Sequence, residues 1–282
     1  MDPSERVSRL LGGGVASATP AGTAITGERW RLRLADGRDV FAKTRTDAPD
    51  GFFATEAAGL EWLGAAPGGP PVPTPLGYDA DLLALPWLVE ERPSGGAVEQ
   101  LGRELAAMHA AGSPVFGAAR DGWIGAAELE NRPADEWPEF YAGRRVLPYV
   151  RRLRDAAELS AGEAAVFERL AARLPELAGP AEPPARIHGD LWCGNVLWSG
   201  ERGWLVDPAA HGGHRETDLA MLALFAEGWV PRLLAAYAEI TPLADGWQER
   251  QGLHQVHPLL VHAVLFGGGY LSAALAAAGG YL

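Results

Sequence analysis

The chain has 282 residues, about half of them hydrophobic, so it can bury a large core as one large domain or as two lobes. Its formal net charge of -12 argues against a nucleic-acid partner, because binding to a phosphate backbone relies on a basic face. A cationic or neutral small molecule is more compatible with this charge.

The sequence predicts a cytoplasmic protein. The single cysteine, Cys193, cannot form an internal disulfide, and residues 1–14 show neither the apolar core of a signal peptide nor a lipidation pattern. Because about 18 uninterrupted apolar residues are needed to span a bilayer and none occur together, we expect neither a membrane helix nor a membrane partner. The sequence does not indicate the oligomeric state, and a monomer is the default expectation.

The first part of the chain reads as a small sheet with one helix. Trp30–Asp36 and Asp39–Thr44 alternate apolar and polar residues on either side of a turn at Gly37, which predicts a hairpin with Lys43 on its second strand. Phe52–Ala66 repeats apolar residues at helical spacing and predicts a helix.

The character of the sequence changes near residue 90. Residues 67–79 are dense in Pro and Gly and predict a loop, and residues 82–91 predict a buried strand that Pro86 interrupts. Helical patterns dominate after this point. We therefore predict an N-terminal nucleotide-binding lobe over 1–90 and a helical lobe with the catalytic loop and substrate pocket over 91–282.

The second part is predicted to be mainly helical. Helical spacing covers residues 97–112, 136–153 and 160–177, the last with a Ser–Glu capping box at its start, and helices resume from Thr217. Between them, residues 195–207 predict a short hairpin with a Gly-containing turn. The fold class is therefore α+β, with a small antiparallel sheet lobe and a larger helical lobe.

Three polar residues around this hairpin match the order used in phosphoryl transfer. Asp190 and Asn195 are five residues apart in IHGDLWCGNVLW, and Asp207 follows the hairpin. In phosphoryl transfer an Asp accepts the proton of the acceptor hydroxyl, an Asn five residues later binds a metal ion, and a later Asp holds Mg²⁺. We therefore predict Asp190, Asn195 and Asp207 as catalytic residues, the last two as metal ligands.

An upstream lysine and a helical glutamate complete this arrangement. Lys43 lies on a predicted strand and Glu56 on the next predicted helix, in the order expected for a lysine that binds phosphates and a glutamate that orients it. Lys43 alone would more often be an exposed strand residue, and Glu56 with the downstream residues favours the functional interpretation.

Longer stretches resemble a known family. HGDLWCGNVLW (188–198), DPAAHGGHRETDLAM (207–221) and HPLLVHAVLFGGGYL (257–271) are similar to the fructosamine kinase, or ketosamine 3-kinase, family. These enzymes are related to aminoglycoside and choline kinases and have a two-lobed, protein-kinase-like fold. The resemblance covers nearly the whole chain, so we expect this fold and the use of ATP and Mg²⁺.

The resemblance also implies residue roles. It makes Asp190 the base and Asn195 and Asp207 the Mg²⁺ ligands, and it places the adenine against the backbone of residues 90–92. The nucleotide-binding residues implied in this way are Lys43, Glu56, Glu90, Glu91, Arg92, Gly22 and Ile25.

The phosphate loop departs from the family pattern. The aligned stretch is GTAITGERW, Gly22 to Trp30, in which glycines are fewer and Thr26 stands where an Asn is expected. Glycine lets backbone N–H groups approach phosphate closely, so this change predicts a looser or altered lid over ATP.

The substrate residues are predicted less directly. Trp192 could form the floor of a sugar pocket and His262 could donate to a sugar hydroxyl, although either could instead belong to the core. Arg215 and Glu216 could also reach the pocket, or could form an ion pair with each other.

Three further residues are expected to support the loop. His188 is expected to brace the catalytic loop through the backbone, and Asp218 to hold that loop by its N–H groups. Cys193 is expected to fill buried space.

The favoured function is an ATP-dependent kinase acting on a ketosamine of the fructosamine or ribulosamine type, free or on a glycated protein lysine, at the 3-hydroxyl as the resemblance implies. The alternatives are an aminoglycoside or other amino-alcohol phosphotransferase, and a nucleotide-binding kinase fold without turnover. The sequence does not determine which sugar and amine are used.

Overall fold

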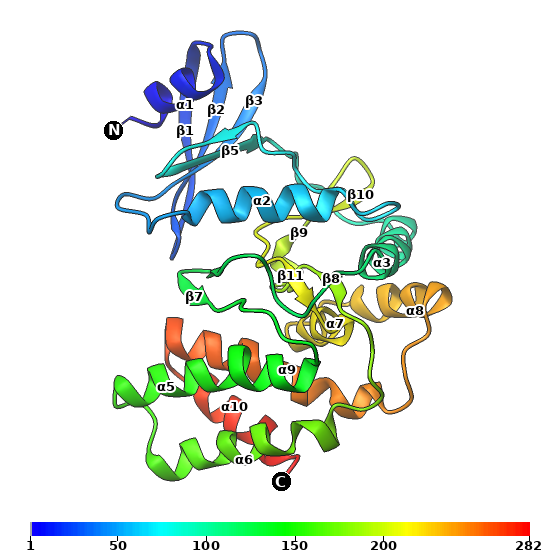
Figure 1. Ribbon diagram of the computed structural model, residues 1–282. Coiled ribbons are helices and arrows are strands. Elements are labelled where there is room, and N and C mark those ends of the chain that lie inside the picture. Colours follow the sequence, from blue (N-terminus) through cyan, green and yellow to red (C-terminus); the bar gives the residue numbers. More distant parts are fainter. Residues whose placement is uncertain (1) are drawn as a thin grey trace.

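The computed structural model describes residues 2–282 and shows two lobes (Figure 1). A small antiparallel sheet lies above a larger, mostly helical part, and helix α2 lies between the sheet and that larger part. This arrangement confirms the predicted fold class. The small lobe also has a second helix that was not predicted, α1 (Pro3–Leu11), which packs on the sheet through the buried Val7.

The small lobe is a five-stranded antiparallel sheet in the order β1-β2-β3-β5-β4. Its strands are β1 (Val15–Ala24), β2 (Gly27–Leu34), β3 (Asp39–Thr44), β4 (Gly77–Tyr78) and β5 (Leu82–Pro86). Strands β2 and β3 are the predicted hairpin. They form because their alternating apolar residues bury one face of the sheet against α1.

One predicted strand of this lobe is shorter than expected, and another strand was not predicted. The strand expected over residues 82–91 ends at Pro86, because proline has no N–H to continue the ladder. The following segment runs to the larger lobe, where the Glu91 N–H donates to the Trp198 carbonyl at 2.8 Å. Strand β1 was not predicted, because its Ala- and Thr-rich sequence lacks alternation of apolar and polar residues, and it is held by pairing with β2.

Helix α2 (Phe52–Gly64) is the predicted helix of this lobe. Its buried residues Phe53, Ala57 and Leu60 pack with Leu83 and Leu85 of the sheet. This packing fixes the helix against β5 and holds its first turns, which carry Glu56, beside strand β3.

The larger lobe is helical, as predicted. Its helices are α3 (Gly95–Ala110), α4 (Trp137–Phe140), α5 (Leu147–Asp155), α6 (Ala161–Leu177), α7 (Arg215–Leu224), α8 (Val230–Ile240), α9 (Trp247–Phe266) and α10 (Tyr270–Gly279). The predicted helix over residues 136–153 is divided, with a π-helical segment, Tyr141–Val146, between α4 and α5. The capping box predicted at Ser160 is present.

Three short antiparallel strand pairs complete this lobe. They are β6 (Gly122–Ile124) with β7 (Ala127–Leu129), β8 (Ala185–Ile187) with β11 (His211–Gly213), and β9 (Val196–Ser199) with β10 (Arg202–Leu205). The last pair is the hairpin predicted over residues 195–207. Its buried Val196 and Leu205 pack into a core shared with α3 and α8, which fixes the hairpin to the lobe.

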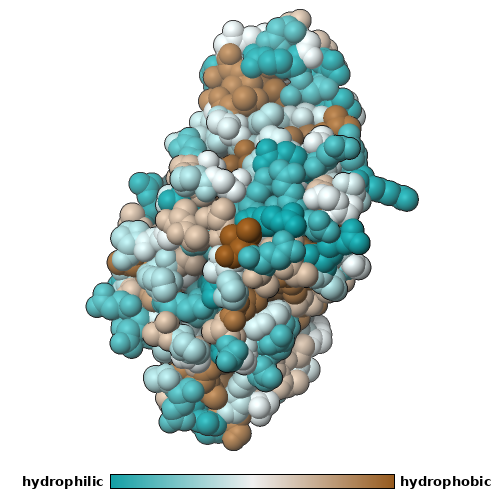
Figure 2. Space-filling view, turned by 90° about the vertical axis from the view of Figure 1, so that its right-hand side faces the viewer, coloured by the Kyte–Doolittle hydropathy of each residue, from teal (hydrophilic) through white to brown (hydrophobic). Residues whose placement is uncertain are grey.

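The segment between Pro86 and Gly95 links the two lobes, and the predicted boundary at residue 90 falls within it. That 1–90 and 91–282 are separate units remains a prediction. Over residues 2–282, none of the helices has the length and apolar character that crossing a membrane requires. On the face seen in Figure 2, hydrophobic residues form small patches scattered among hydrophilic ones.

Candidate active site

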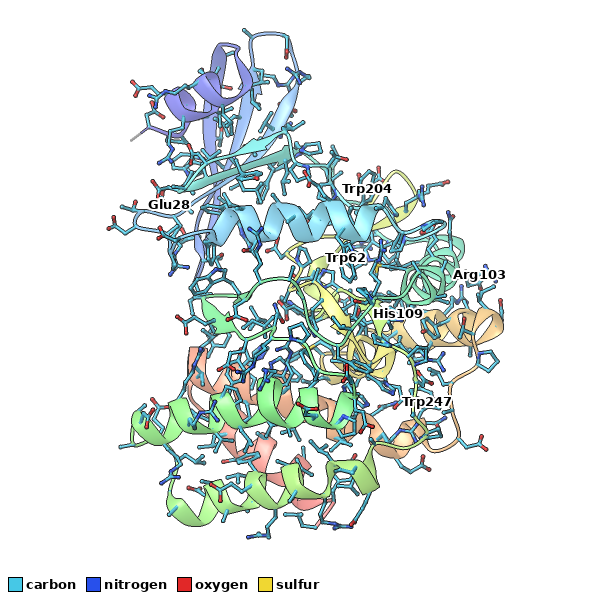
Figure 3. All side chains as sticks on the ribbon, in the orientation of Figure 1. Glu28, Trp62, Arg103, His109, Trp204 and Trp247 are labelled. Atoms are coloured by element: carbon cyan, nitrogen blue, oxygen red, sulfur yellow. The ribbon has the colours of Figure 1, made fainter. Side chains whose placement is uncertain are left out.

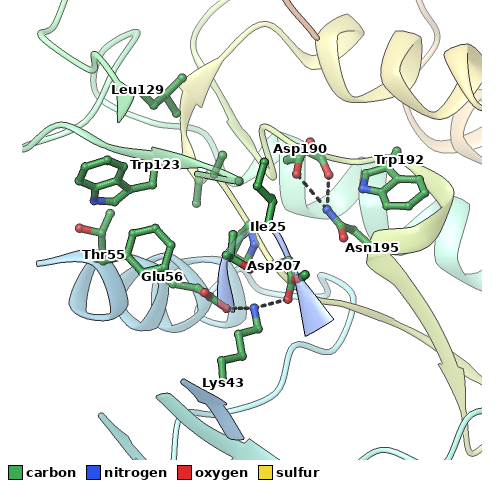
Figure 4. Close-up of a pocket in the computed structure, with 18 of the residues that line it drawn as sticks. Ile25, Lys43, Thr55, Glu56, Trp123, Leu129, Asp190, Trp192, Asn195 and Asp207 are labelled. Atoms are coloured by element: carbon green, nitrogen blue, oxygen red, sulfur yellow. Dashed lines mark hydrogen bonds and ion pairs between the residues drawn. The ribbon is translucent and has the colours of Figure 1, made fainter. Parts of the chain in front are cut away.

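A cavity of about 180 Å³ lies where the two lobes meet (Figure 4). Both lobes contribute side chains to it. From the small lobe the lining includes Ala24, Ile25, Thr26, Arg29, Lys43, Thr55 and Glu56, and from the larger lobe Trp123, Leu129, Asn131, Asp190, Trp192, Asn195 and Asp207.

The buried carboxylate of Asp218 holds the loop that carries Asp190. Asp218 accepts hydrogen bonds from the backbone N–H groups of His188 at 2.7 Å and Gly189 at 2.9 Å, as predicted. His109, labelled in Figure 3, lies 3.1 Å from the same carboxylate. Burial opposes ionisation of Asp218, but the contact with His109 and the backbone donors keeps its pKa below the usual range. Asp218 is therefore an anionic anchor for the loop.

His188 connects this loop to the neighbouring hairpin. Its Nε2 lies 2.9 Å from the carbonyl oxygen of Val206, the residue after β10. Burial lowers the pKa of His188, so the ring is neutral and its Nε2–H donates to this carbonyl. The predicted bracing role through the backbone is confirmed, and the contact fixes the position of the adjacent Asp207.

Asn195 holds Asp190 through its side-chain amide. Its Nδ2 donates to the Asp190 backbone carbonyl at 2.8 Å and to the Asp190 carboxylate at 3.1 Å. Because Nδ2 is occupied by these two hydrogen bonds, the amide oxygen of Asn195 is the atom that could bind a cation. Desolvation, followed by the negative charge of Asp207, raises the pKa of Asp190 to about 8.

Lys43 lies between two carboxylates from opposite lobes (Figure 4). Its Nζ is 2.6 Å from Glu56 Oε1 and also forms an ion pair with Asp207. Burial would lower the pKa of Lys43, but these two carboxylates raise it above its usual value, so the ammonium is retained. The predicted contact between Lys43 and Glu56 is confirmed, whereas the direct contact with Asp207 was not predicted.

Asp207 has a left-handed backbone conformation, with φ of 56°. Few residues other than glycine adopt this conformation, although Asp and Asn tolerate it best, and it concentrates at functional sites. Asp207 follows strand β10 with one residue, Val206, between them. Burial alone would raise the pKa of Asp207. The positive charges of Lys43 and Arg29 outweigh this effect and hold the pKa below its usual range.

Several lining residues were not predicted. Arg29 lies 3.4 Å from the Asp207 carboxylate, and Trp123 and Leu129 come from the β6–β7 hairpin. The position of Arg29 opposite Lys43 in the β2–β3 hairpin was readable from the sequence, because alternation places paired residues on one face. The position of Trp123 depends on the tertiary fold and had no local signal.

Some predicted nucleotide residues lie outside the cavity lining. Ile25 lines the cavity, whereas Gly22 lies within strand β1. Glu90, Glu91 and Arg92 are exposed in the segment between the lobes, where the Glu91 carboxylate accepts a hydrogen bond from the Gly200 N–H at 3.0 Å. Contact of residues 90–92 with a nucleotide remains a prediction.

Arg215 and Glu216 lie outside the cavity lining, and their contact with a substrate remains a prediction. Arg215 forms an ion pair with Glu182 at 2.6 Å, and the buried Glu216 forms one with Arg250 at 2.6 Å. The two residues do not pair with each other. Each charge is neutralised by a partner distant in the sequence, so both residues hold α7 in place.

Phe225 lies between the rings of Trp192 and His262. Trp192 lines the cavity and is 40% exposed, so it is not a core residue. Its ring lies 6.1 Å from that of Phe225, which in turn lies 5.2 Å from the His262 ring. His262 is half-buried beyond the cavity lining, and its Nδ1 donates to the Pro258 carbonyl at 2.7 Å. Cys193 is buried, as predicted.

Comparisons with known proteins agree with this arrangement. A probable ketoamine kinase of Thermus thermophilus is 36% identical over 245 residues, covering 86% of each chain. The chloroplastic protein-ribulosamine 3-kinase of Arabidopsis thaliana is 30% identical over 271 residues, covering 88% of this chain and 77% of that protein.

Solved structures show the same fold. A crystal structure from Thermobifida fusca, provisionally named a fructosamine-3-kinase, is 48% identical with a TM-score of 0.94, and the match covers 99% of this chain and 98% of that one. The two-lobed kinase-like fold is also shared with macrolide and aminoglycoside phosphotransferases, whose low sequence identity makes that likeness one of fold alone. The family model described as fructosamine kinase matches residues 7–279, and the chain belongs to this family.

Proposed function

We propose that this protein is a kinase that transfers the γ-phosphoryl group of ATP to the 3-hydroxyl of a ketosamine. The observation that carries this proposal is the meeting of Asp190, Asn195, Asp207 and Lys43 in one interlobe cavity, in a chain of the fructosamine kinase family. The substrate class comes from the relatives, one named a ketoamine kinase and another a protein-ribulosamine 3-kinase.

The residues of the cavity fit a magnesium nucleotide. The Asp207 carboxylate and the Asn195 amide oxygen are the hard oxygen donors that Mg²⁺ prefers, and Lys43 supplies a fixed positive charge for phosphates. When bound, the metal ion would neutralise charge on the phosphate oxygens. Glu56 holds Lys43 in place through their 2.6 Å ion pair.

Asp190 is the proposed general base. The substrate hydroxyl oxygen forms a bond to the γ-phosphorus, the bond from that phosphorus to the ADP oxygen breaks, and Asp190 takes the hydroxyl proton. The hydrogen bond from Asn195 Nδ2 orients the Asp190 carboxylate for this step. The pKa of about 8 makes Asp190 a stronger base than an ordinary carboxylate, and neutralisation of Asp207 by a cation would lower that pKa towards neutrality.

Trp192 is the proposed platform for the sugar. Its exposed ring borders the cavity close to Asp190, where it can contact the C–H face of a sugar while the amine substituent points to solvent. An outward-pointing substituent suits both a free ketosamine and a glycated lysine on a protein. Use of ATP also accords with the predicted cytoplasmic location.

The test is ADP release with MgATP and a panel of acceptors. We expect turnover with amines of fructose, ribulose or erythrulose, and loss of that turnover in Asp190→Asn. Turnover with aminoglycosides but no ketosamine would replace the proposal with the amino-alcohol phosphotransferase alternative. Thermal stabilisation by ATP without any ADP release would indicate the nucleotide-binding alternative.

A further inference from the structure

Arg29 is a second cation in the cavity, beside Lys43. The two residues are directly paired across β2 and β3, and residues that pair in this way project from the same face of a sheet. Both line the interlobe cavity. Arg29 lies next to Glu28, which Figure 3 labels on the small lobe. We propose that Arg29 binds the nucleotide phosphates together with Lys43.

The contacts of Arg29 show what it would give up to a nucleotide. Its Nη2 lies 3.4 Å from Asp207 Oδ2, while Lys43 contacts Oδ1 of the same carboxylate. Two cations of the small lobe thus share one anion of the larger lobe. Asp207 is also the residue proposed to hold Mg²⁺. If Asp207 held the metal ion, Arg29 and Lys43 would be free to pair with the nucleotide phosphates instead of this carboxylate.

The guanidinium has unused donors at this position. Arg29 Nε is buried and has no hydrogen-bond partner within residues 2–282, and the single contact to Asp207 is longer than most charged hydrogen bonds. A buried polar atom without a partner is costly unless something binds there. A phosphate, which can accept two parallel N–H bonds from one guanidinium, fits this requirement.

This role also accounts for the glycine-poor loop between β1 and β2. The cavity is lined here by Ala24, Ile25 and Thr26, whose side chains restrict how closely backbone N–H groups can approach a phosphate. Arg29 follows two residues after the strand β2 begins and supplies N–H donors from a side chain. The inference rests on the proposed use of ATP but does not depend on the identity of the acceptor.

The test compares the binding of ADP with that of adenosine, which lacks the diphosphate. In the presence of Mg²⁺, isothermal titration calorimetry should show Arg29→Ala weakening ADP binding about 10- to 100-fold while adenosine binding stays unchanged, with Arg29→Lys in between. Arg33→Ala is the matched control, because Arg33 lies on the same strand but is exposed and pairs with Asp39. It should leave both affinities unchanged.

Two results would overturn the assignment. Unchanged ADP affinity in Arg29→Ala would mean that Arg29 only bridges the lobes, and equal losses for ADP and adenosine would mean that its removal disturbs the site as a whole. The calorimetry uses no ketosamine. Failure to phosphorylate a ketosamine would therefore bear on the proposed function and not on the role of Arg29. Absence of ADP binding by the unmodified protein would overturn both this inference and the proposed function.

Discussion

Asp190 and Asp207 line the same cavity, yet their surroundings move their pKa values in opposite directions. Desolvation and the charge of Asp207 raise the pKa of Asp190, whereas Lys43 and Arg29 keep that of Asp207 low. Pairs of carboxylates separated in this way usually divide the tasks of proton acceptor and permanent anion. The difference supports Asp190 as base and Asp207 as metal ligand.

Asp190→Asn tests the base. The variant keeps the shape of the side chain but cannot accept the hydroxyl proton, so we expect turnover to fall at least ~100-fold. Nucleotide affinity, measured by calorimetry, should change little because Lys43 and Asp207 are untouched. Turnover above a tenth of that of the unmodified protein would exclude Asp190 as the base.

The same variant should change how stability depends on pH. Because the pKa of Asp190 is raised in the folded state, its stabilising contribution is complete below the unfolded pKa and is lost as pH rises through about 8. Without nucleotide or metal, the Tm of Asp190→Asn should therefore exceed that of the unmodified protein by an amount that grows from pH 5 to 8 and then levels off. A difference independent of pH would contradict the raised pKa.

Asp207→Ala tests the proposed metal ligand. Without this carboxylate the larger lobe would lose a residue proposed to hold Mg²⁺, so we expect Mg²⁺-dependent ATP binding and activity to be lost together. Calorimetry with and without Mg²⁺ measures this directly. Unchanged binding of MgATP would show that the metal is held elsewhere.

At the scale of elements, helix α7 fixes the catalytic loop through Asp218. This buried residue accepts two backbone hydrogen bonds from the loop and contacts His109 on α3. Asp218→Ala would leave these donors buried without an acceptor, and we expect the free energy of unfolding to fall by about 3–5 kcal/mol. Chemical denaturation measures the change.

A matched control is Asp155→Ala at the end of α5. Asp155 is exposed, so its removal should alter the free energy of unfolding by no more than about 0.5 kcal/mol. If the two variants have similar stability, Asp218 does not anchor the loop.

Elements with strong local signals could be predicted from the sequence, and those held by pairing could not. The β2–β3 and β9–β10 hairpins and α2 were predicted because alternation, turns and helical spacing are local. Strand β1 has no such pattern and is held by its neighbour.

The same distinction applies to the site. The order of Asp190, Asn195 and Asp207 along the chain was enough to predict that they meet. The contact of Lys43 with Glu56 was predicted in the same way. The ion pairs of Arg215 with Glu182 and of Glu216 with Arg250 could not be predicted, because only the tertiary fold brings these partners together.

At the scale of the whole molecule, both cations named in the cavity belong to the small lobe, which also contributes the carboxylate of Glu56. Lys43 and Arg29 come from the sheet, and Asp190 and Asp207 come from the larger lobe. Figure 4 shows Lys43 beside Asp207. The only ionic contacts across the cavity are those of the two cations with Asp207, among the residues that the structure describes. Nucleotide binding would thus exchange a direct contact between the lobes for one through phosphates.

Phosphorylation of a ketosamine at its 3-hydroxyl can be followed by NMR of the reaction products over time. The carbonyl of a ketosamine is at C2, so a phosphate at C3 lies on the adjacent carbon. When C1 loses a proton to form the C1–C2 enaminol, the C3–O bond can break and release inorganic phosphate, and hydrolysis of the resulting imine then frees the amine. After incubation with MgATP and a fructosamine, we expect ADP first, and then free amine and inorganic phosphate that continue to appear after the enzyme is removed. A phosphorylated product that stays intact for days, or a phosphate on a terminal hydroxyl, would contradict the assignment.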